Sequence, residues 1–221
     1  MSKAKTKPDA TPPEATLPAA RKQPAQIRSK ERLERILAAA RELIAQKGSD
    51  LVKMSEVAAL ADISIGSLYQ YFPDKSALIR TLAEQYNAES RRCIAAALEG
   101  VNDLKRLLEA YCSLVDQYFA IVTAEPVMRD IWSGMQADKQ LMALQLTESR
   151  TCGEMLASAM RRVHPKANRR RMDESAFLIW ELGEATVRMA ISVPPKEGRA
   201  LVETFKRLTV RELEDPLKVF T

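Results

Sequence analysis

The sequence predicts an all-α fold. Apolar residues recur at intervals of three and four along most of the chain, which is the spacing of one face of an α-helix. Only 7 Gly and 11 Pro interrupt the 221 residues, and the helix-favouring residues Ala, Leu, Glu and Arg are abundant. No stretch alternates apolar and polar residues over the length of a strand, and no internal repeat is present. We therefore expect a wholly helical protein.

Composition is that of a soluble globular protein, with 46% hydrophobic and 29% charged residues. The longest uncharged apolar stretches are far shorter than the ~20 residues that cross a bilayer, so no membrane partner is expected. A Pro- and Thr-rich stretch follows the basic first residues, where a secretory signal needs an apolar segment. Cys93, Cys112 and Cys152 are odd in number and widely spaced, which fits reduced thiols in the cytoplasm.

The net charge of +5 is unevenly distributed. Residues 21–80 carry 11 basic against 7 acidic side chains, whereas residues 81–221 carry 20 of each. This asymmetry favours a polyanion-binding module ahead of a neutral body. A basic surface that only keeps the protein in solution is the alternative that charge alone leaves open.

Residues 1–27 are predicted to form a flexible basic tail, because they are rich in Pro, Ala, Lys and Thr and lack a hydrophobic period. Ser29 then offers an N-cap for the first helix, and Gly48 ends that helix. One apolar stripe lies between them and consists of Leu33, Ile36, Leu37, Ala40, Leu43 and Ile44.

Three helical units come after Gly48. The first has one apolar face, formed by Met54, Val57, Ala58 and Ala61. The second is stopped by Pro73, and its period directs inward Ile65, Leu68 and Phe72. Between these units, Asp62 tolerates a left-handed backbone and Ser64 can cap the second unit. Asp74 can cap the third unit, which is longer and ends near Gly100.

Five more helices are expected in the remaining chain. Their apolar residues are in phase over about residues 101–123, 126–135, 138–164, 172–193 and 196–213. Pro126 takes the first helical position that proline favours, and Asp138 is a candidate cap. Pro165 and Pro194 fall just beyond two of the helix ends.

The second and third of the N-terminal helices match a helix-turn-helix within residues 28–80, because a tight turn joins them and the later one is too short to be stable alone. With Leu68 in the core, steps of about 100° per residue put Gly66 and Gln70 on the far side, flanked by Ser67 and Tyr69. Gly66 lets the backbone approach a groove wall, and Gln70 can form a bidentate pair with adenine in the major groove. This face predicts contact with double-stranded DNA.

Neighbouring polar groups are candidates for phosphate contacts. The hydroxyls of Tyr69 and Tyr71 and the ammonium of Lys75 lie where they could meet phosphates, which position a protein without reading sequence. Ser64 at the N-cap adds free backbone N–H groups at the positive end of the helix dipole. These residue types leave one alternative open, a packing corner between two helices whose tyrosines only reach toward solvent.

Residues 57–78, VAALADISIGSLYQYFPDKSAL, closely resemble the signature of TetR-family transcriptional regulators. The resemblance covers about residues 29–80, and beyond them only helix number and total length agree. It implies base-facing positions on the recognition helix for Ile65, Gly66, Ser67 and Gln70. It implies phosphate-contacting positions for Tyr69, Tyr71 and Lys75, and a place near the DNA backbone for Ser55.

Three residues depart from the family pattern. Ser49 stands where an aromatic residue usually follows the glycine. Lys53 replaces a common Thr or Ser near the start of the second helix, and its charge could offset the lost hydroxyl contact. Asp62 replaces the usual turn glycine and adds a negative group beside the DNA, so we expect it to weaken binding slightly.

The same resemblance implies that residues 81–221 bind a small effector and form a homodimer. Seven residues in phase on the last two helices are expected at the dimer interface: Ile179, Trp180, Gly183, Val187, Leu201, Phe205 and Leu208. Two such helices from each subunit could close a four-helix bundle, and the resulting two-fold symmetry predicts an inverted-repeat operator. The alternative is that these faces form core within one chain.

Large, adaptable apolar side chains around the middle helices are candidates for the effector site. They are Tyr111, Tyr118, Met128, Trp132, Met135, Met155 and Phe177. Their character suggests a hydrophobic or aromatic effector, although such stripes also form ordinary core. The effector would favour a state in which the two recognition helices no longer match successive grooves of the DNA.

Other chemistries lack the residues they need, so neither a metal, a cofactor nor an enzyme activity is expected. His164 is the single histidine, and the cysteines lack C-x-x-C spacing. Cys112 could be a redox-sensing thiol, but inert packing fits it better. No Gly-rich phosphate loop or nucleophile elbow occurs. Arg161-Arg162 and residues 169–171 form a basic cluster that is more typical of a solvated face than of a second polyanion site.

The leading hypothesis is a cytoplasmic, ligand-responsive transcriptional regulator that binds an inverted-repeat operator as a homodimer and acts as a repressor released by a small apolar effector. The alternative is a helical nucleoid-associated or partner-binding protein that uses the same fold without effector-controlled transcription. Repression and activation are both compatible with these residues.

Overall fold

The computed structural model describes residues 22–135 and 139–216. These residues form nine helices and no strand, so the predicted all-α fold is confirmed. The helices are α1 (Lys22–Lys47), α2 (Met54–Leu60), α3 (Ile65–Tyr71), α4 (Lys75–Leu98), α5 (Leu104–Ala124), α6 (Pro126–Met135), α7 (Lys139–Val163), α8 (Arg169–Ala190) and α9 (Pro195–Glu214). None of the helices in this described part is long and apolar enough to cross a membrane.

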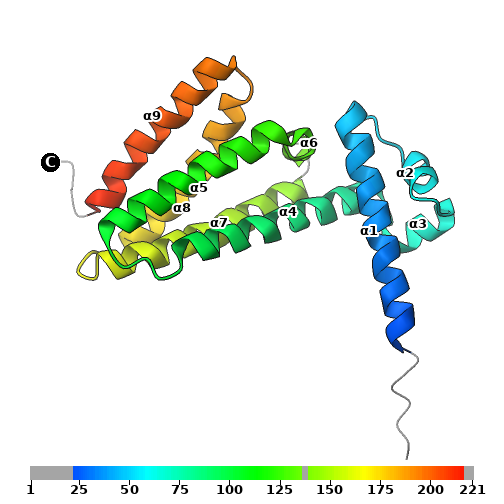
Figure 1. Ribbon diagram of the computed structural model, residues 1–221, viewed down its shortest axis with the longest axis horizontal. Coiled ribbons are helices and arrows are strands. Elements are labelled where there is room, and N and C mark those ends of the chain that lie inside the picture. Colours follow the sequence, from blue (N-terminus) through cyan, green and yellow to red (C-terminus); the bar gives the residue numbers. More distant parts are fainter. Residues whose placement is uncertain (1–21, 136–138, 217–221) are drawn as a thin grey trace, which may run out of the picture.

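The helices are arranged in two regions joined by α4 (Figure 1). Helices α1, α2 and α3 gather at one end of the molecule, and α4 leads from them into a bundle with α5, α7, α8 and α9. Helix α6 lies at the junction, where it contacts both α1 and α4. A change in the position of α6 can therefore affect both regions.

The core of the N-terminal region extends into the junction. Leu37 of α1, Leu68 of α3 and Leu78 of α4 are buried together. Val127 and Ile131 of α6 belong to the same buried cluster. The N-terminal helices and α6 therefore share one buried core, in which α1 and α4 contact α6.

The second core lies among α4, α5, α7, α8 and α9. Helices α7 and α8 approach closely at Gly153, where an added Cβ would lie 2.9 Å from the Cα of Phe177. Helices α5 and α9 are joined inside the bundle because the hydroxyl of Tyr111 bonds to Oγ1 of Thr209 at 2.7 Å. These contacts fix the relative positions of the bundle helices.

The turns and caps near the motif agree with the sequence predictions. Ser64 Oγ accepts a hydrogen bond from the backbone N–H of Ser67 at 3.2 Å, and Asp74 Oδ1 accepts one from Ala77 at 2.7 Å. Asp62 adopts the left-handed backbone with φ of +54°, as does Gly48 with +84°. The tight turn between α2 and α3 is thus encoded by residues that tolerate or satisfy it.

Some predicted boundaries were wrong. Helix α1 begins at Lys22, so residues 22–27 of the predicted tail are helical and Ser29 is not an N-cap. Pro24 is compatible with this start because the N–H groups of a first turn have no partner within the helix. Helix α8 begins at Arg169 after the cap Asn168 and ends at Ala190, earlier than predicted at both ends. The candidate cap Asp138 lies outside the described residues.

Candidate functional site

Helix α3 has the orientation that the sequence predicts. Leu68 is fully buried, whereas Gly66 and Gln70 are exposed. A Cβ built on Gly66 meets no atom within 4 Å, so the backbone there is open to a close approach from outside. Ala58 of α2 is buried and small, which lets the two helices approach.

Ile65 does not point inward as its helical period predicts. Its side chain is 42% exposed, and Ile63 in the preceding turn packs against the core in its place. Because Ile65 is the first residue of α3, the turn before it rather than the helix sets its direction. Its exposure agrees with the base-facing position that the family resemblance implies. Tyr69 is 50% exposed, which agrees with its implied phosphate-contacting position.

Two predicted phosphate ligands also hold the domain together. The hydroxyl of Tyr71 bonds to Oγ of Ser29 at 3.1 Å, which ties the end of α3 to α1. The ammonium of Lys75 donates to the backbone carbonyls of Ser49 and Asp50, both at 3.0 Å. An ammonium has three N–H groups, so one more remains for a phosphate. Contact of either residue with DNA stays a prediction.

The start of α2 presents Lys53 and Ser55, both exposed. Glu56 organises this helix start, because its Oε2 accepts from the backbone N–H of Lys53 at 2.9 Å and from Nζ of Lys47 at 2.6 Å. The bond from Lys47 is the main reason why the pKa of Glu56 lies below its ordinary value. The side chain of Lys53 therefore projects from an ordered helix N-terminus.

Asp130 of α6 joins the helix-turn-helix to the bundle, and sequence reasoning missed it. Its Oδ2 accepts a hydrogen bond from the backbone N–H of Ser49 at 2.5 Å. A Cβ on Gly48 would lie 3.2 Å from the other carboxylate oxygen, so the turn passes close to this side chain. Ser49 is 4% exposed, and the bond is therefore shielded from water. No local pattern marks Asp130, because its partner is 81 residues away.

A cavity of about 120 Å³ lies among α4, α5, α6, α8 and α9. Three of the predicted effector residues, Tyr111, Tyr118 and Met128, line it. Trp132 lies behind the wall, with its ring centroid 5.5 Å from that of Tyr118. Five further lining residues lie on α4 and were missed: Tyr86, Glu89, Ser90, Cys93 and Ile94. Their intervals of three and four residues place them on one face of α4, which the sequence could have indicated. They were missed because α4 was predicted only as the third helical unit after Gly48, with no part in the effector site.

Two other predicted effector residues, Met155 and Phe177, do not line the cavity. Met155 is half-buried against the second core. Phe177 lies against α7, where the guanidinium of Arg150 stands 4.6 Å from its ring centroid. The side chain of Met135 lies outside the described residues. Apolar periodicity identified an inward face correctly but could not say which inward residues border empty space.

Most predicted dimer-interface residues face the interior of their own chain. Five of the seven line the cavity instead: Ile179, Trp180, Gly183, Val187 and Phe205. A Cβ on Gly183 would lie 3.3 Å from the Phe205 ring, so this glycine allows close packing of α8 on α9 within one chain. Leu201 is half-buried, and Leu208 is 60% exposed. Ile179, Val187 and Phe205 are buried within one chain, so the interface prediction was wrong for these three. A helix's apolar period does not separate its core face from an interface.

Two carboxyl groups line this largely apolar cavity, the exposed Glu89 and the buried Glu184. Glu184 is 9% exposed, and Nε2 of Gln145 donates to its Oε2. Burial is the main cause that raises its pKa to about 7. Burial also raises the pKa of Tyr111 and Tyr118, so both phenols stay neutral. Among the described residues, no Lys, Arg or His side chain lines the cavity.

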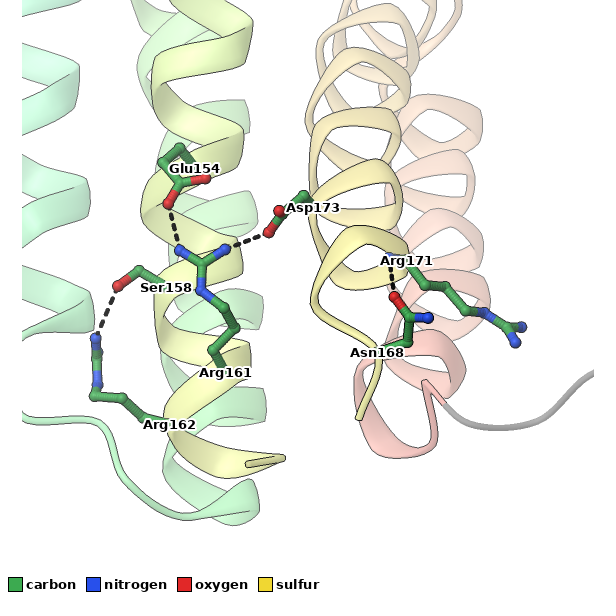
Figure 2. A network of polar contacts seen from close by, with 7 residues as sticks. All are labelled: Glu154, Ser158, Arg161, Arg162, Asn168, Arg171 and Asp173. Atoms are coloured by element: carbon green, nitrogen blue, oxygen red, sulfur yellow. Dashed lines mark hydrogen bonds and ion pairs between the residues drawn. The ribbon is translucent and has the colours of Figure 1, made fainter. Parts of the chain in front are cut away.

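The remaining candidate groups have structural partners. Figure 2 shows that Arg161 pairs with Glu154 and Asp173, which links α7 to α8. Arg162 Nε donates to the carbonyl of Val101 at 2.8 Å, and His164 Nε2 bonds to that of Leu213 at 2.8 Å.

Burial raises the pKa of the Cys112 thiol, which favours its inert, protonated form. No group of residues in the described ranges could hold a metal ion.

Comparisons with known proteins agree with both regions. A family model described as "Bacterial regulatory proteins, tetR family" matches residues 36–82. A second, described as "Tetracyclin repressor-like, C-terminal domain", matches residues 104–217, just over half of the chain.

Individual proteins are similar over part or most of the chain. The chain is 31% identical to the HTH-type transcriptional regulator YvdT of Bacillus subtilis over 49% of its length and 55% of that protein. It is 26% identical to UidR of Escherichia coli over 60% of its length and 66% of that protein. A TetR-family regulator from Streptomyces coelicolor has the same fold, with a TM-score of 0.67 and 23% identity over 86% of this chain and 99% of that one. The chain thus spans between half and two thirds of these two curated relatives.

Proposed function

Because this chain belongs to the TetR family of bacterial regulatory proteins, we propose that it binds an inverted-repeat operator as a homodimer, represses transcription there, and is released by a small apolar effector. The observation that carries the proposal is the outer face of α3. This face is held outward by the buried Leu68 and presents Gly66 and Gln70 to solvent. On this account the protein acts in the cytoplasm, where it meets its operator.

The proposed DNA contacts fall into two kinds. Gln70 reads a base in the major groove, with Ile65, Gly66 and Ser67 beside it on the same helix. The remaining contacts go to phosphates, from Lys53, Ser55, Ser64, Tyr69, Tyr71 and Lys75. The N-terminus of α3 supports the second kind, because its free N–H groups and dipole attract an anion.

The proposed dimer interface uses the outward faces of α8 and α9 rather than the inward ones. Leu178 and Leu182 of α8 are 56% and 47% exposed, and they lie four residues apart on one face. Leu208 of α9 is 60% exposed. A two-fold interface that covers these leucines would join α8 and α9 of two subunits in a four-helix arrangement.

The cavity supports effector control because it borders the helix that contacts the N-terminal region. Met128 of α6 lines the cavity, and Asp130 two residues later holds the turn at Ser49. An effector that displaces Met128 would move α6 and disturb this bond. Coupling of this kind is typically ~1–3 kcal/mol, enough to weaken operator binding by about one or two powers of ten.

A footprint on the DNA upstream of the protein's own gene, taken over a series of salt concentrations, tests the proposal. Protection of a palindrome with a steep loss of affinity at high salt supports it. Protection that is independent of sequence would favour the nucleoid-associated alternative instead. The Gln70→Ala variant tests the base contact itself, because its exposed side chain can be removed without disturbing the core.

A further inference from the structure

We propose that the effector is a small organic cation, a compact apolar or aromatic body that carries an ammonium group, and that Glu184 is its counter-ion. The inference deepens the proposed function and rests on it for the meaning of the cavity. It stands on the position of this carboxyl in the wall, on the composition of the wall, and on the volume of the cavity.

Glu184 is a buried acid that no ion pair compensates in the described part of the chain. Gln145 donates a hydrogen bond to its Oε2, and the side chain of Trp180 is a further hydrogen-bond partner. Arg188, one turn further along α8, acts on the carboxyl only through its charge and forms no hydrogen bond with it. The neighbouring buried acid, Glu148, differs in this respect because it is paired with Arg91. A buried carboxylate is costly unless a charge or several hydrogen bonds compensate it.

The fold itself does not require the charge of Glu184. A glutamine at this position could form the same kind of bond with Gln145 and would avoid the cost of removing a carboxylate from water. The amide oxygen of Gln145 is buried and has no hydrogen-bond partner among the described residues. The local polar arrangement is therefore incomplete, and an ammonium donor in the cavity would supply the missing charge for Glu184.

The rest of the wall suits a cation. Five of its side chains are aromatic, namely Tyr86, Tyr111, Tyr118, Trp180 and Phe205. Aromatic faces attract cations, most strongly where water is excluded. Glu89, on α4, adds a second acidic side chain to the lining, although it is paired with Arg92. The lining thus carries acids and aromatic faces, and no basic side chain among the described residues.

The volume limits the size of the ligand. A cavity of about 120 Å³ is close to the ~150 Å³ of an apolar cavity that holds one benzene molecule. The described arrangement therefore suits an amine with one ring or a short branched chain.

Three probes that share one phenyl ring test the proposal: phenethylammonium, 2-phenylethanol and 3-phenylpropanoate, titrated into the full-length protein by calorimetry. Trp180 in the wall provides a second, fluorescent readout. We expect the cation to bind at least about tenfold more tightly than the alcohol and the anion, because a charge-assisted hydrogen bond is stronger than a neutral one. In Glu184→Gln, the cation should lose about tenfold in affinity, while the affinity of the alcohol changes less than about twofold.

Glu174→Gln is the matched control, because Glu174 lies on the exposed side of the same helix and pairs with Arg170 at its surface. This variant should bind all three probes as the parent protein does. Equal affinities for the three probes, an unchanged cation preference in Glu184→Gln, or no binding of the cation at millimolar concentration would each overturn the proposal.

Operator binding, measured in parallel, separates the two proposals. If the cation binds through Glu184 but DNA is not bound under any condition, the ligand class stands and the proposed function fails. If DNA is bound and then released by the neutral probe alone, the proposed function stands and the ligand class fails.

Discussion

Replacing Glu184 with glutamine should stabilise the protein at pH 8 more than at pH 5. Its pKa is about 7 in the folded chain against an ordinary value of 4.5, so unfolding lets this carboxyl ionise more easily. A group whose pKa is raised by folding stabilises the folded chain fully at pH values below its pKa in the unfolded chain. This stabilisation is lost as the pH rises through the pKa of the group in the folded chain. Between pH 5 and pH 8, the free energy of unfolding falls by about 2–3 kcal/mol through this group.

The charged neighbours of Glu184 change its pKa less than burial does, because Glu181 raises it and Arg188 lowers it. Burial raises the pKa of Tyr118 on α5 and of Cys152 on α7, so both stay protonated over this range. Glu181 and Arg188 on α8 itself carry opposite charges and are both half-buried. The titration of Glu184 should therefore dominate the pH dependence of this part of the bundle.

Urea unfolding at pH 5 and pH 8 measures the effect for the parent protein, Glu184→Gln and the control Glu174→Gln. The difference between Glu184→Gln and the parent should grow by about 2–3 kcal/mol between the two pH values, while the control difference stays within about 0.5 kcal/mol. A constant difference, or a less stable Glu184→Gln at pH 8, would refute the burial and pairing assigned to this carboxyl.

Three further predictions concern stability, assembly and the junction. Leu68→Ala should lower the free energy of unfolding by about 2–5 kcal/mol in urea titrations, because it removes a fully buried side chain; a loss below about 1 kcal/mol would contradict the packing of α3. Leu182→Asp should shift the protein from dimer to monomer in sedimentation, and an intact dimer would exclude this face of α8. Asp130→Ala should cost about 1–3 kcal/mol of stability because it leaves the buried N–H of Ser49 without its acceptor, and it should also alter operator affinity. Unchanged operator affinity in Asp130→Ala would show that the bond from α6 to Ser49 does not influence DNA binding.

The DNA-facing geometry was predictable from the sequence because local rules determine it. The cap at Ser64, the left-handed Asp62 and the burial of Leu68 follow from residue type and helical period alone. Ile65 was the exception, since at a helix start the preceding turn decides the direction of the side chain.

The effector region was predictable only in part because its walls come from distant segments. Periodicity found the inward faces of α5 and α8, but it placed Ile179 and Phe205 at a dimer interface when they line the cavity. It also gave no sign of Glu184, because an acid on an apolar face looks like an ordinary exposed residue until the packing of α7 against α8 is known. Long-range packing supplied what local pattern could not.

The most direct test of DNA reading by α3 is the affinity of Gln70→Ala and Lys53→Ala for the footprinted operator and for copies of it with single base pairs changed. We predict that Gln70→Ala loses discrimination at one base pair of each half-site, a difference of about 1–3 kcal/mol in binding free energy. Lys53→Ala should bind every copy more weakly to the same extent. It should also reduce the slope of log affinity against log salt concentration by about one. If Gln70→Ala retains the full preference of the parent at every base pair, the exposed face of α3 does not read the operator.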